Sequence, residues 1–287
     1  MRSKQAWPEV TVVSPEQRES GMGVIEIGPE AGPVEEARGR IYAFLGALFS
    51  HPDTGKWGRV LNADEQRLAI ATADALRARA CGMKYLVLAD ELPGSELDLR
   101  FLVVELCQPL EHLKAEYERV LCVRRPRPGC SPFALDHQKE ITGFLLAESL
   151  ANLAGVYRAF GFAQGNKLPL RTDHIAYELE FMSWLISQRR LVSRMALFDR
   201  QAAEQATRCD LAQRSFFSDH LAGWAGPLSA GLQKYTGGGY FEPLGRFLAA
   251  WIPLERHFLN AEPPCEEIHG SQEEAPVGSR NGPFSVV

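Results

Sequence analysis

Residues 168–182 read Leu-Pro-Leu-Arg-Thr-Asp-His-Ile-Ala-Tyr-Glu-Leu-Glu-Phe-Met and carry the clearest structural signal in the chain. Either Thr172 or Asp173 can accept hydrogen bonds from the first free amides of a helix, which predicts that a helix begins here. The apolar residues that follow have helical spacing: Ile175, Leu179, Met182 and then Leu185 or Ile186. The stretch therefore predicts an amphipathic helix that packs one face against a core.

The same helical period extends on both sides of this stretch. Apolar stripes with helical spacing occupy residues 41–48, 68–76, 110–121, 141–160, 199–225, 228–232 and 241–259. Helix-ending residues separate the stripes, among them Pro52, Gly161 and the triplet Gly237–Gly239. No alternating segment longer than residues 83–88 favours a strand. We therefore expect an all-α fold, with a single globular multi-helix domain over residues 38–260.

Both ends of the chain differ from this helical region. Residues 1–37 contain four prolines and four glycines and show no sustained period. Residues 261–287 contain further prolines beside an acidic run of Glu266, Glu267, Glu273 and Glu274. Such segments bury too little apolar surface to offset the entropy lost on ordering. We expect residues 1–37 to be a disordered tail and residues 261–287 to be a disordered acidic tail.

The composition is that of an ordinary globular protein. Of 287 residues, 45% are hydrophobic and 23% charged, and 36 acidic against 31 basic residues give a net charge of −5. This mild acidity argues against non-specific binding to nucleic acid or anionic lipid, which usually needs a basic surface. No export signal and no membrane span is apparent, and the six cysteines match no zinc or thioredoxin-like spacing. These features predict a cytoplasmic protein.

His174 and Glu178 are the first candidates for chemistry, because residues four apart share one face of a helix. A helical metal or redox enzyme could use this pair together with cysteines, although two ligands do not complete a metal site. A di-iron carboxylate bundle needs two Glu-x-x-His pairs, and only Glu266 and His269 have that spacing. The structural alternative is that Asp173 caps the helix and His174 bonds to a neighbouring loop.

A basic loop lies between Cys122 and Cys130. It could hold an acidic partner, or its two cysteines could form a redox pair. It could equally be a solvated loop with two thiols facing inward, and no neighbouring histidine points to an activated thiol.

Residues 172–182 resemble a signature, Pro-Asp-Asp-His followed by Glu-Leu-Glu-Phe-Met, of the TorD, DmsD and NarJ family of molybdoenzyme assembly chaperones, also called redox enzyme maturation proteins. Further similarity lies, in the family's order, in residues 113–121, 131–133, 154–162, 220–224 and 241–248. The resemblance covers about residues 40–259. Two departures are Thr172, where the signature has its first Asp, and Leu121-Cys122-Val123, where the family usually has Phe-Gly-Pro.

The resemblance implies a TorD-like helical fold and a cytoplasmic chaperone with no catalytic reaction and no cofactor of its own. Its partner would be the catalytic subunit of a molybdenum-containing oxidoreductase, bound through a twin-arginine signal peptide or N-terminal segment while the cofactor is inserted and before export. An apolar groove with carboxylates at one end suits such a peptide. The residues expected to bind the peptide or to form a hinge are Asp173, His174, Glu178, Glu180, Glu116, Tyr117, Pro132 and Phe133.

Two other functions stay open at this point, namely the metal or redox enzyme that uses His174 and Glu178 and a helical adaptor unrelated to molybdoenzymes. The hinge would lie at Asp173 and His174, after the connector formed by residues 161–171. The sequence indicates no nucleic-acid partner and no metal, and it leaves open whether the chain acts as a monomer or a homodimer.

Overall fold

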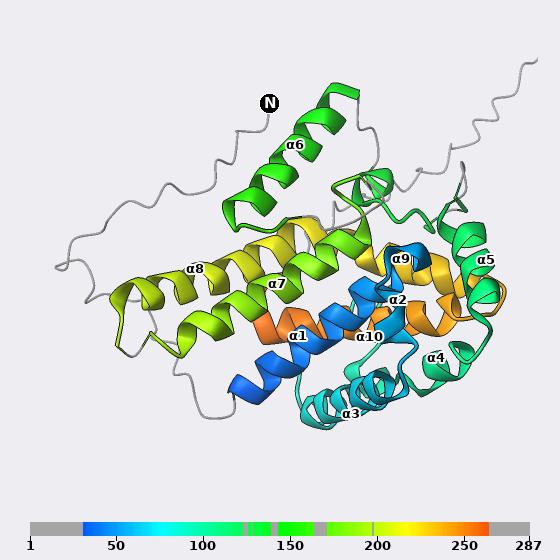
Figure 1. Cartoon of the computed structure of the whole chain (residues 1–287), viewed down its shortest axis with the longest axis horizontal. Coiled ribbons are helices and arrows are strands. Elements are labelled where there is room, and N and C mark those ends of the chain that lie inside the picture. The colour runs from blue at the N-terminus through cyan, green and yellow to red at the C-terminus, as the bar shows by residue number, and fades with distance from the viewer. Residues whose placement is uncertain are drawn as a thin grey trace, which may run out of the picture.

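A computed structural model shows the chain as a bundle of helices (Figure 1) and describes residues 31–122, 126–127, 129–138, 143–163, 171–196 and 198–263. The α-helices are α1 (Ala31–Leu48), α2 (Trp57–Val60), α3 (Ala63–Ala80), α4 (Arg100–Glu105), α5 (Leu110–Leu121), α6 (Gly143–Ala159), α7 (Ile175–Ser193), α8 (Arg200–Phe216), α9 (Ala222–Tyr235) and α10 (Phe241–Leu259). Short 3₁₀ turns occupy Pro52–Thr54, Gly94–Glu96 and Ala134–His137, and the π-helical turn Phe217–Leu221 joins α8 to α9.

The predicted all-α fold is confirmed. Across the described residues there is no strand, and a single isolated antiparallel bridge joins Phe133 to His174. Helix α7 packs against both α1 and α8, while α9 packs along α10 (Figure 1). Fourteen of the 19 residues of α10 are buried, which makes it the central helix, as expected for a helix that is apolar on most of its faces.

Local side-chain and backbone features fix where several helices begin and end. Asn62 Oδ1 accepts hydrogen bonds from the amides of Asp64 and Glu65 at 2.9 and 3.1 Å and so caps α3. Gly161 follows α6 with a φ of +66°, a left-handed conformation that glycine adopts without steric cost. The helix that the sequence predicts to close at Gly161 therefore does so.

Helix α1 begins earlier than the sequence predicts. The expected tail of residues 1–37 includes residues 31–37, which are helical. Pro33 lies in the first turn of α1, where the amide hydrogen that it lacks would have had no helical partner. The rest of that tail, residues 1–30, and residues 264–287 of the expected acidic tail lie outside the described residues.

The predicted helix over residues 199–225 is divided in the structure. Helix α8 ends at Phe216, the π-helical turn follows, and α9 continues past Pro227, which lies inside α9 and does not open a new helix. The wider π turn lets the adjacent residues Phe216 and Phe217 both face the core. The helical spacing of apolar residues continues across such a turn, so the spacing alone does not reveal where the π-helical turn lies.

Helix α6 packs on the bundle mainly through its C-terminal half. Val156 and Tyr157 are buried, whereas Phe144 and Leu145 are 79% and 48% exposed. Figure 1 shows α6 standing apart from the other long helices. The continuous helical period of this segment therefore does not correspond to a continuously buried face.

Two buried ion pairs tie the central helix to its neighbours. Arg38 on α1 bonds both carboxylate oxygens of Glu255 on α10 at 2.6 and 2.8 Å, and it also donates to Gln213 Oε1 on α8 at 3.0 Å. Arg256, the next residue on α10, bonds Glu91 through Nη1 at 3.0 Å. Buried charges persist when they are paired and hydrogen-bonded in this way.

Candidate functional site

The signature lies at a junction between residues 131–137 and residues 171–178, here called the signature junction. Asp173 is buried and accepts hydrogen bonds from Arg171 Nε at 2.6 Å, Arg171 Nη2 at 2.8 Å and the amide of Leu135 at 3.0 Å. Arg171 also bonds Asp136 at 2.8 Å and stacks over the ring of Phe133, 4.2 Å from its centroid. Asp173 therefore fastens the 131–137 segment to the start of α7.

His174, and not Asp173, caps α7. Its Nδ1 accepts a hydrogen bond from the amide of Ala176 at 3.1 Å, and the carbonyl of Pro132 accepts from the amide of Ile175 at 2.8 Å. Burial, aided by the positive charges of Arg171 and Lys56, lowers the pKa of His174 to about 3. The imidazole is therefore neutral at physiological pH and can act as the acceptor that the cap requires.

The structure thus exchanges the two roles that the sequence analysis proposes, because Asp173 bonds to the loop and His174 forms the cap.

Glu178 is fully buried one turn further along α7. Trp224 Nε1 on α9 donates to Glu178 Oε2 at 3.0 Å, and Glu178 Oε1 has no hydrogen-bond partner among the described residues. Burial raises the pKa of this carboxyl well above its ordinary value, which favours the protonated form. Within the described part of the chain, no group of three His, Cys, Asp or Glu side chains is placed to hold a metal ion.

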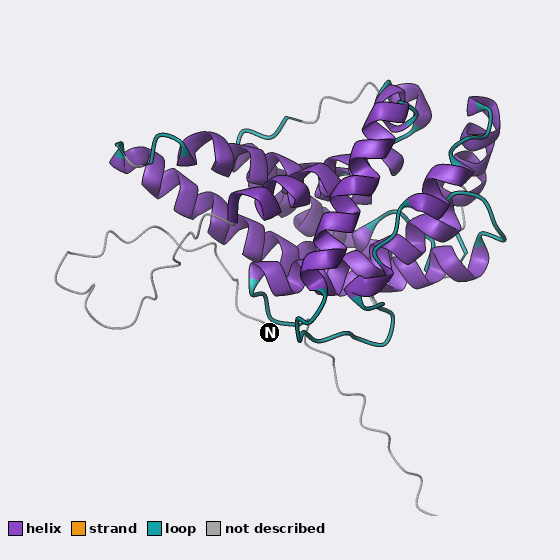
Figure 2. Ribbon diagram, turned by 90° about the horizontal axis from the view of Figure 1, so that it is seen from below, coloured by secondary structure: helices purple, strands orange, loops and turns teal. Residues whose placement is uncertain are grey.

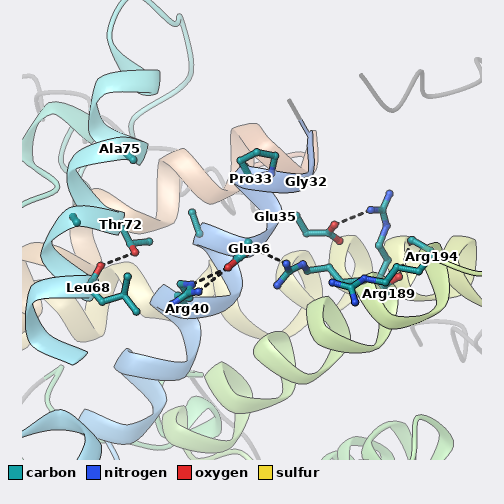
Figure 3. A pocket seen from close by; sticks show the side chains of 14 residues that line it. Gly32, Pro33, Glu35, Glu36, Arg40, Leu68, Thr72, Ala75, Arg189 and Arg194 are labelled. Carbon is teal, nitrogen blue, oxygen red and sulfur yellow. Dashed lines mark hydrogen bonds and ion pairs between the residues drawn. The ribbon is translucent and has the colours of Figure 1, made fainter. Parts of the chain in front are cut away.

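Glu180 lies on a different surface, in a cleft between α1, α3 and α7. The cleft has two adjoining parts of about 740 and 600 Å³, which share Glu36, Arg40, Leu68 and Arg190. Figure 3 shows the first part, and Glu180 lines the second. The carboxylates of the cleft have cationic partners: Glu35 pairs with Arg189, Glu36 with Arg40 and Arg190, Glu65 with Arg59, and Glu180 with Lys56. Six basic side chains against four acidic ones line the cleft, which therefore suits an arginine-bearing peptide poorly.

Glu116 and Tyr117 anchor the inner side of α5. Glu116 accepts hydrogen bonds from the amides of Tyr240 and Phe241 at 3.3 and 3.4 Å, so it caps the start of α10, and burial raises the pKa of its carboxyl. The hydroxyl of Tyr117 is buried and donates to the carbonyl of Phe49 at 2.9 Å. Both residues connect α5 to the core.

The outer side of α4 and α5 carries features that the sequence analysis does not single out. Phe101 and Val104 are 71% and 64% exposed, and Leu110 is also exposed. Three carboxylates on the same two helices, those of Glu105, Glu111 and Glu118, form no ion pair with any described residue. These six residues are here called the α4–α5 surface. The sequence does show apolar residues interleaved with Glu on these two short helices. Helical spacing alone, however, assigns such apolar residues to a core.

The loop between Cys122 and Cys130 does not form a disulfide. Both thiols are free, with Cys122 exposed and Cys130 buried. Partial burial of the sulfur atom, together with the charge of Glu118, raises the pKa of the Cys122 thiol, and burial raises that of Cys130, so neither thiol is activated as a nucleophile. Residues 123–125 and Pro128 of this loop lie outside the described residues.

Residues 100–230 match the family model described as nitrate reductase delta subunit. The chain carries a nitrate reductase delta subunit domain of the NarJ/TorD family. This confirms the resemblance seen in the sequence, and the matched residues include both the signature junction and most of α4 through α9. The NarJ/TorD family consists of non-catalytic chaperones for molybdoenzyme maturation, and residues 100–230 are similar to its domain. This match favours a maturation chaperone over the metal or redox enzyme that the sequence left open.

Among solved structures, the chain is similar to that of an Archaeoglobus fulgidus protein assigned as a redox enzyme maturation protein. The two share 18% identity over 75% of this chain and 93% of that chain, with a TM-score of 0.39. No curated protein matches the chain. None of the helices in the described residues is long and apolar enough to cross a membrane.

Proposed function

We propose that this chaperone acts in the cytoplasm and binds the catalytic subunit of a nitrate-reductase-type molybdoenzyme through an arginine-bearing N-terminal segment or a twin-arginine signal peptide. The description of the matched family supports a partner of this type. Binding would hold the subunit back from export while its molybdenum cofactor is inserted. The α4–α5 surface is the observation that carries the proposal.

The α4–α5 surface combines the two properties that such a peptide needs. Phe101 and Val104 offer exposed apolar area to the hydrophobic part of the peptide. Glu111 and Glu118 offer carboxylates that form no ion pair with a described residue, since the nearby Lys114 bonds Asp53. A guanidinium group gains a charge-assisted hydrogen bond there without displacing another cation. In the cleft between α1, α3 and α7 it would have to displace one.

In this proposal the signature residues position the structure and do not touch the peptide. Asp173, His174 and Glu178 are buried: Asp173 holds the segment that contains Pro132 and Phe133, His174 caps α7, and Glu178 joins α7 to α9. Glu116 and Tyr117 have the same role for α5, because they fix its inner side to α10 and to Phe49. Glu180 borders the cleft, where Lys56 neutralises it.

Calorimetric titration of the whole chain with a synthetic peptide, two arginines followed by an apolar stretch, tests the proposal. Phe101→Ser should weaken binding by about tenfold through lost apolar contact. The double variant Glu111→Gln with Glu118→Gln should weaken it by about as much and reduce its dependence on salt, because both carboxylates would lose their charge.

The matched control is Glu148→Gln with Glu204→Gln, which neutralises two exposed carboxylates on α6 and α8. This control should bind the peptide like the unmodified chain. Unchanged affinity in both α4–α5 variants would contradict the proposed binding surface.

A further inference from the structure

The connection between α7 and α8 forms one end of the molecule. Figures 1 and 2 show both helices reaching beyond the other helices along the longest axis. Residues 189–196 and 198–210, here called the α7–α8 tip, make up this end. The α4–α5 surface lies at the opposite end in Figure 1, so the two regions can be tested separately.

The α7–α8 tip exposes an apolar stripe. Helical hydrogen bonds continue past the end of α7, since the amide of Ala196 donates to the carbonyl of Val192 at 3.0 Å and that of Asp199 to the carbonyl of Met195 at 2.9 Å. Leu191, Met195 and Phe198, spaced by four and three residues, therefore share one face. All three are exposed, and Phe198 is 92% exposed.

The charge of the tip is opposite to that of the whole chain. Residues 189–210 contain five arginines and three acidic residues. Each acidic side chain is already engaged: Asp199 caps α8, Glu204 pairs with Arg200 at 2.9 Å and Asp210 pairs with Arg189 at 3.1 Å. Two further arginines, Arg194 and Arg208, are exposed and have no ion-pair partner in the described part of the chain.

We propose that the α7–α8 tip docks reversibly on an anionic lipid surface. Phe198 and Met195 would enter the headgroup region, while Arg194 and Arg208 would meet lipid phosphates, as in other basic amphipathic segments that lie on membranes. None of the three apolar side chains lines either part of the cleft. A projecting apolar tip with arginines beside it fits a deformable bilayer better than a rigid acidic protein.

Co-sedimentation of the whole chain with lipid vesicles tests this inference. Vesicles of one part phosphatidylglycerol to two parts phosphatidylcholine should bind the chain at an ionic strength of about 0.05 M and release most of it at about 0.5 M, because salt screens the attraction. Phe198→Ser should reduce the bound fraction at limiting lipid by about tenfold. Arg194→Gln and Arg208→Gln should each weaken binding by about fivefold.

Phe144→Ser, which removes a phenylalanine that is 79% exposed on α6 and lies outside the tip, is the matched control and should bind vesicles like the unmodified chain. Because Phe198 contacts little of the protein, its substitution does not test folding. Equal binding to vesicles of pure phosphatidylcholine, or unchanged binding by Phe198→Ser, would overturn the proposal. Binding of polyglutamate in place of anionic vesicles would also overturn it and identify a docking site for an acidic protein.

Discussion

The signature junction and the α4–α5 surface distribute polarity in opposite ways. Asp173, His174 and Glu178 are polar and buried, while Phe101 and Val104 are apolar and exposed. Burying polar groups is costly unless hydrogen bonds compensate, and exposed apolar groups forgo the gain of burial. The comparison indicates that the signature maintains the fold, whereas the α4–α5 surface remains available for a client.

Replacing the buried carboxylate of the signature should have the largest effect on stability. Asp173→Ala removes the acceptor for Arg171 and for the amide of Leu135. We expect it to lower the free energy of unfolding by about 3 kcal/mol, because buried donors lose their partner. Urea unfolding measures this change.

The matched control is Asp136→Ala, since Asp136 bonds the same arginine but is exposed. That exposed pair should contribute less than about 1 kcal/mol. If Asp173→Ala weakens peptide binding and leaves the stability unchanged, Asp173 contacts the peptide. The contrast between a structural signature junction and a binding α4–α5 surface would then be wrong.

His174 should make the fold sensitive to acid. Its pKa is about 3 in the folded chain, so between pH 7 and pH 5 the unfolded chain takes up a proton that the folded chain does not. Stability contributed by the neutral imidazole is therefore lost as the pH falls, by about 2 kcal/mol over this range. His174→Asn keeps a side-chain acceptor for the helix cap but removes the titration.

Unfolding measured from pH 7 to pH 5 should therefore give a flatter profile for His174→Asn than for the unmodified chain. His112→Asn, an exposed histidine on α5, serves as the control and should keep the original slope. An identical slope in all three proteins would mean that His174 is accessible to protons, contrary to its assignment as a buried structural residue.

Glu178 should have the opposite dependence on pH. Because burial raises its pKa, the stability of the neutral carboxyl is present at low pH and is lost as the pH rises towards the folded pKa. Glu178→Gln stays neutral and retains an oxygen to accept from Trp224. It should be more stable than the unmodified chain at pH 8, by about 1.4 kcal/mol for each unit by which the pKa is raised.

Thermal unfolding at pH 4 and pH 8 measures the difference, which should be confined to pH 8. Glu148→Gln on α6, an exposed carboxylate, should show no such gain. A Glu178→Gln protein that is less stable at both values of pH would indicate that the ionised carboxylate is needed in the folded state.

The helices were predictable because their signals are local. The period from Leu110 to Leu121, with Pro109 before it, gives the bounds of α5 as the structure has them. Which residue caps α7, in contrast, does not depend on local sequence alone. Both Asp173 and His174 carry suitable acceptors, and the decision depends on residues 131–137, which cross the helix start and bury both side chains.

The sequence could not predict which apolar side chains of the helices are exposed to solvent. Phe101, Val104 and Phe144 have the spacing of core residues, yet none of the described helices covers them. Net charge has the same weakness. A total of −5 argues against anionic lipid, yet Arg194 and Arg208 are exposed at one end of the molecule and form no ion pair with any described residue. Net charge and composition are summed over the whole chain, so they do not show where charged and apolar side chains gather on the surface.

The smallest expected effect is the sharpest test of the α4–α5 surface. Phe101→Ser should change the free energy of unfolding by less than about 0.5 kcal/mol, since an exposed side chain contributes little to the core. Its neighbour Leu102 is buried, and Leu102→Ala should cost about 3 kcal/mol. Urea unfolding of both variants compares two adjacent residues of one short helix. A large loss of stability in Phe101→Ser would place Phe101 in the core and remove the main apolar element of the proposed peptide surface. Unchanged stability together with weakened peptide binding would show that this side chain serves recognition and not folding.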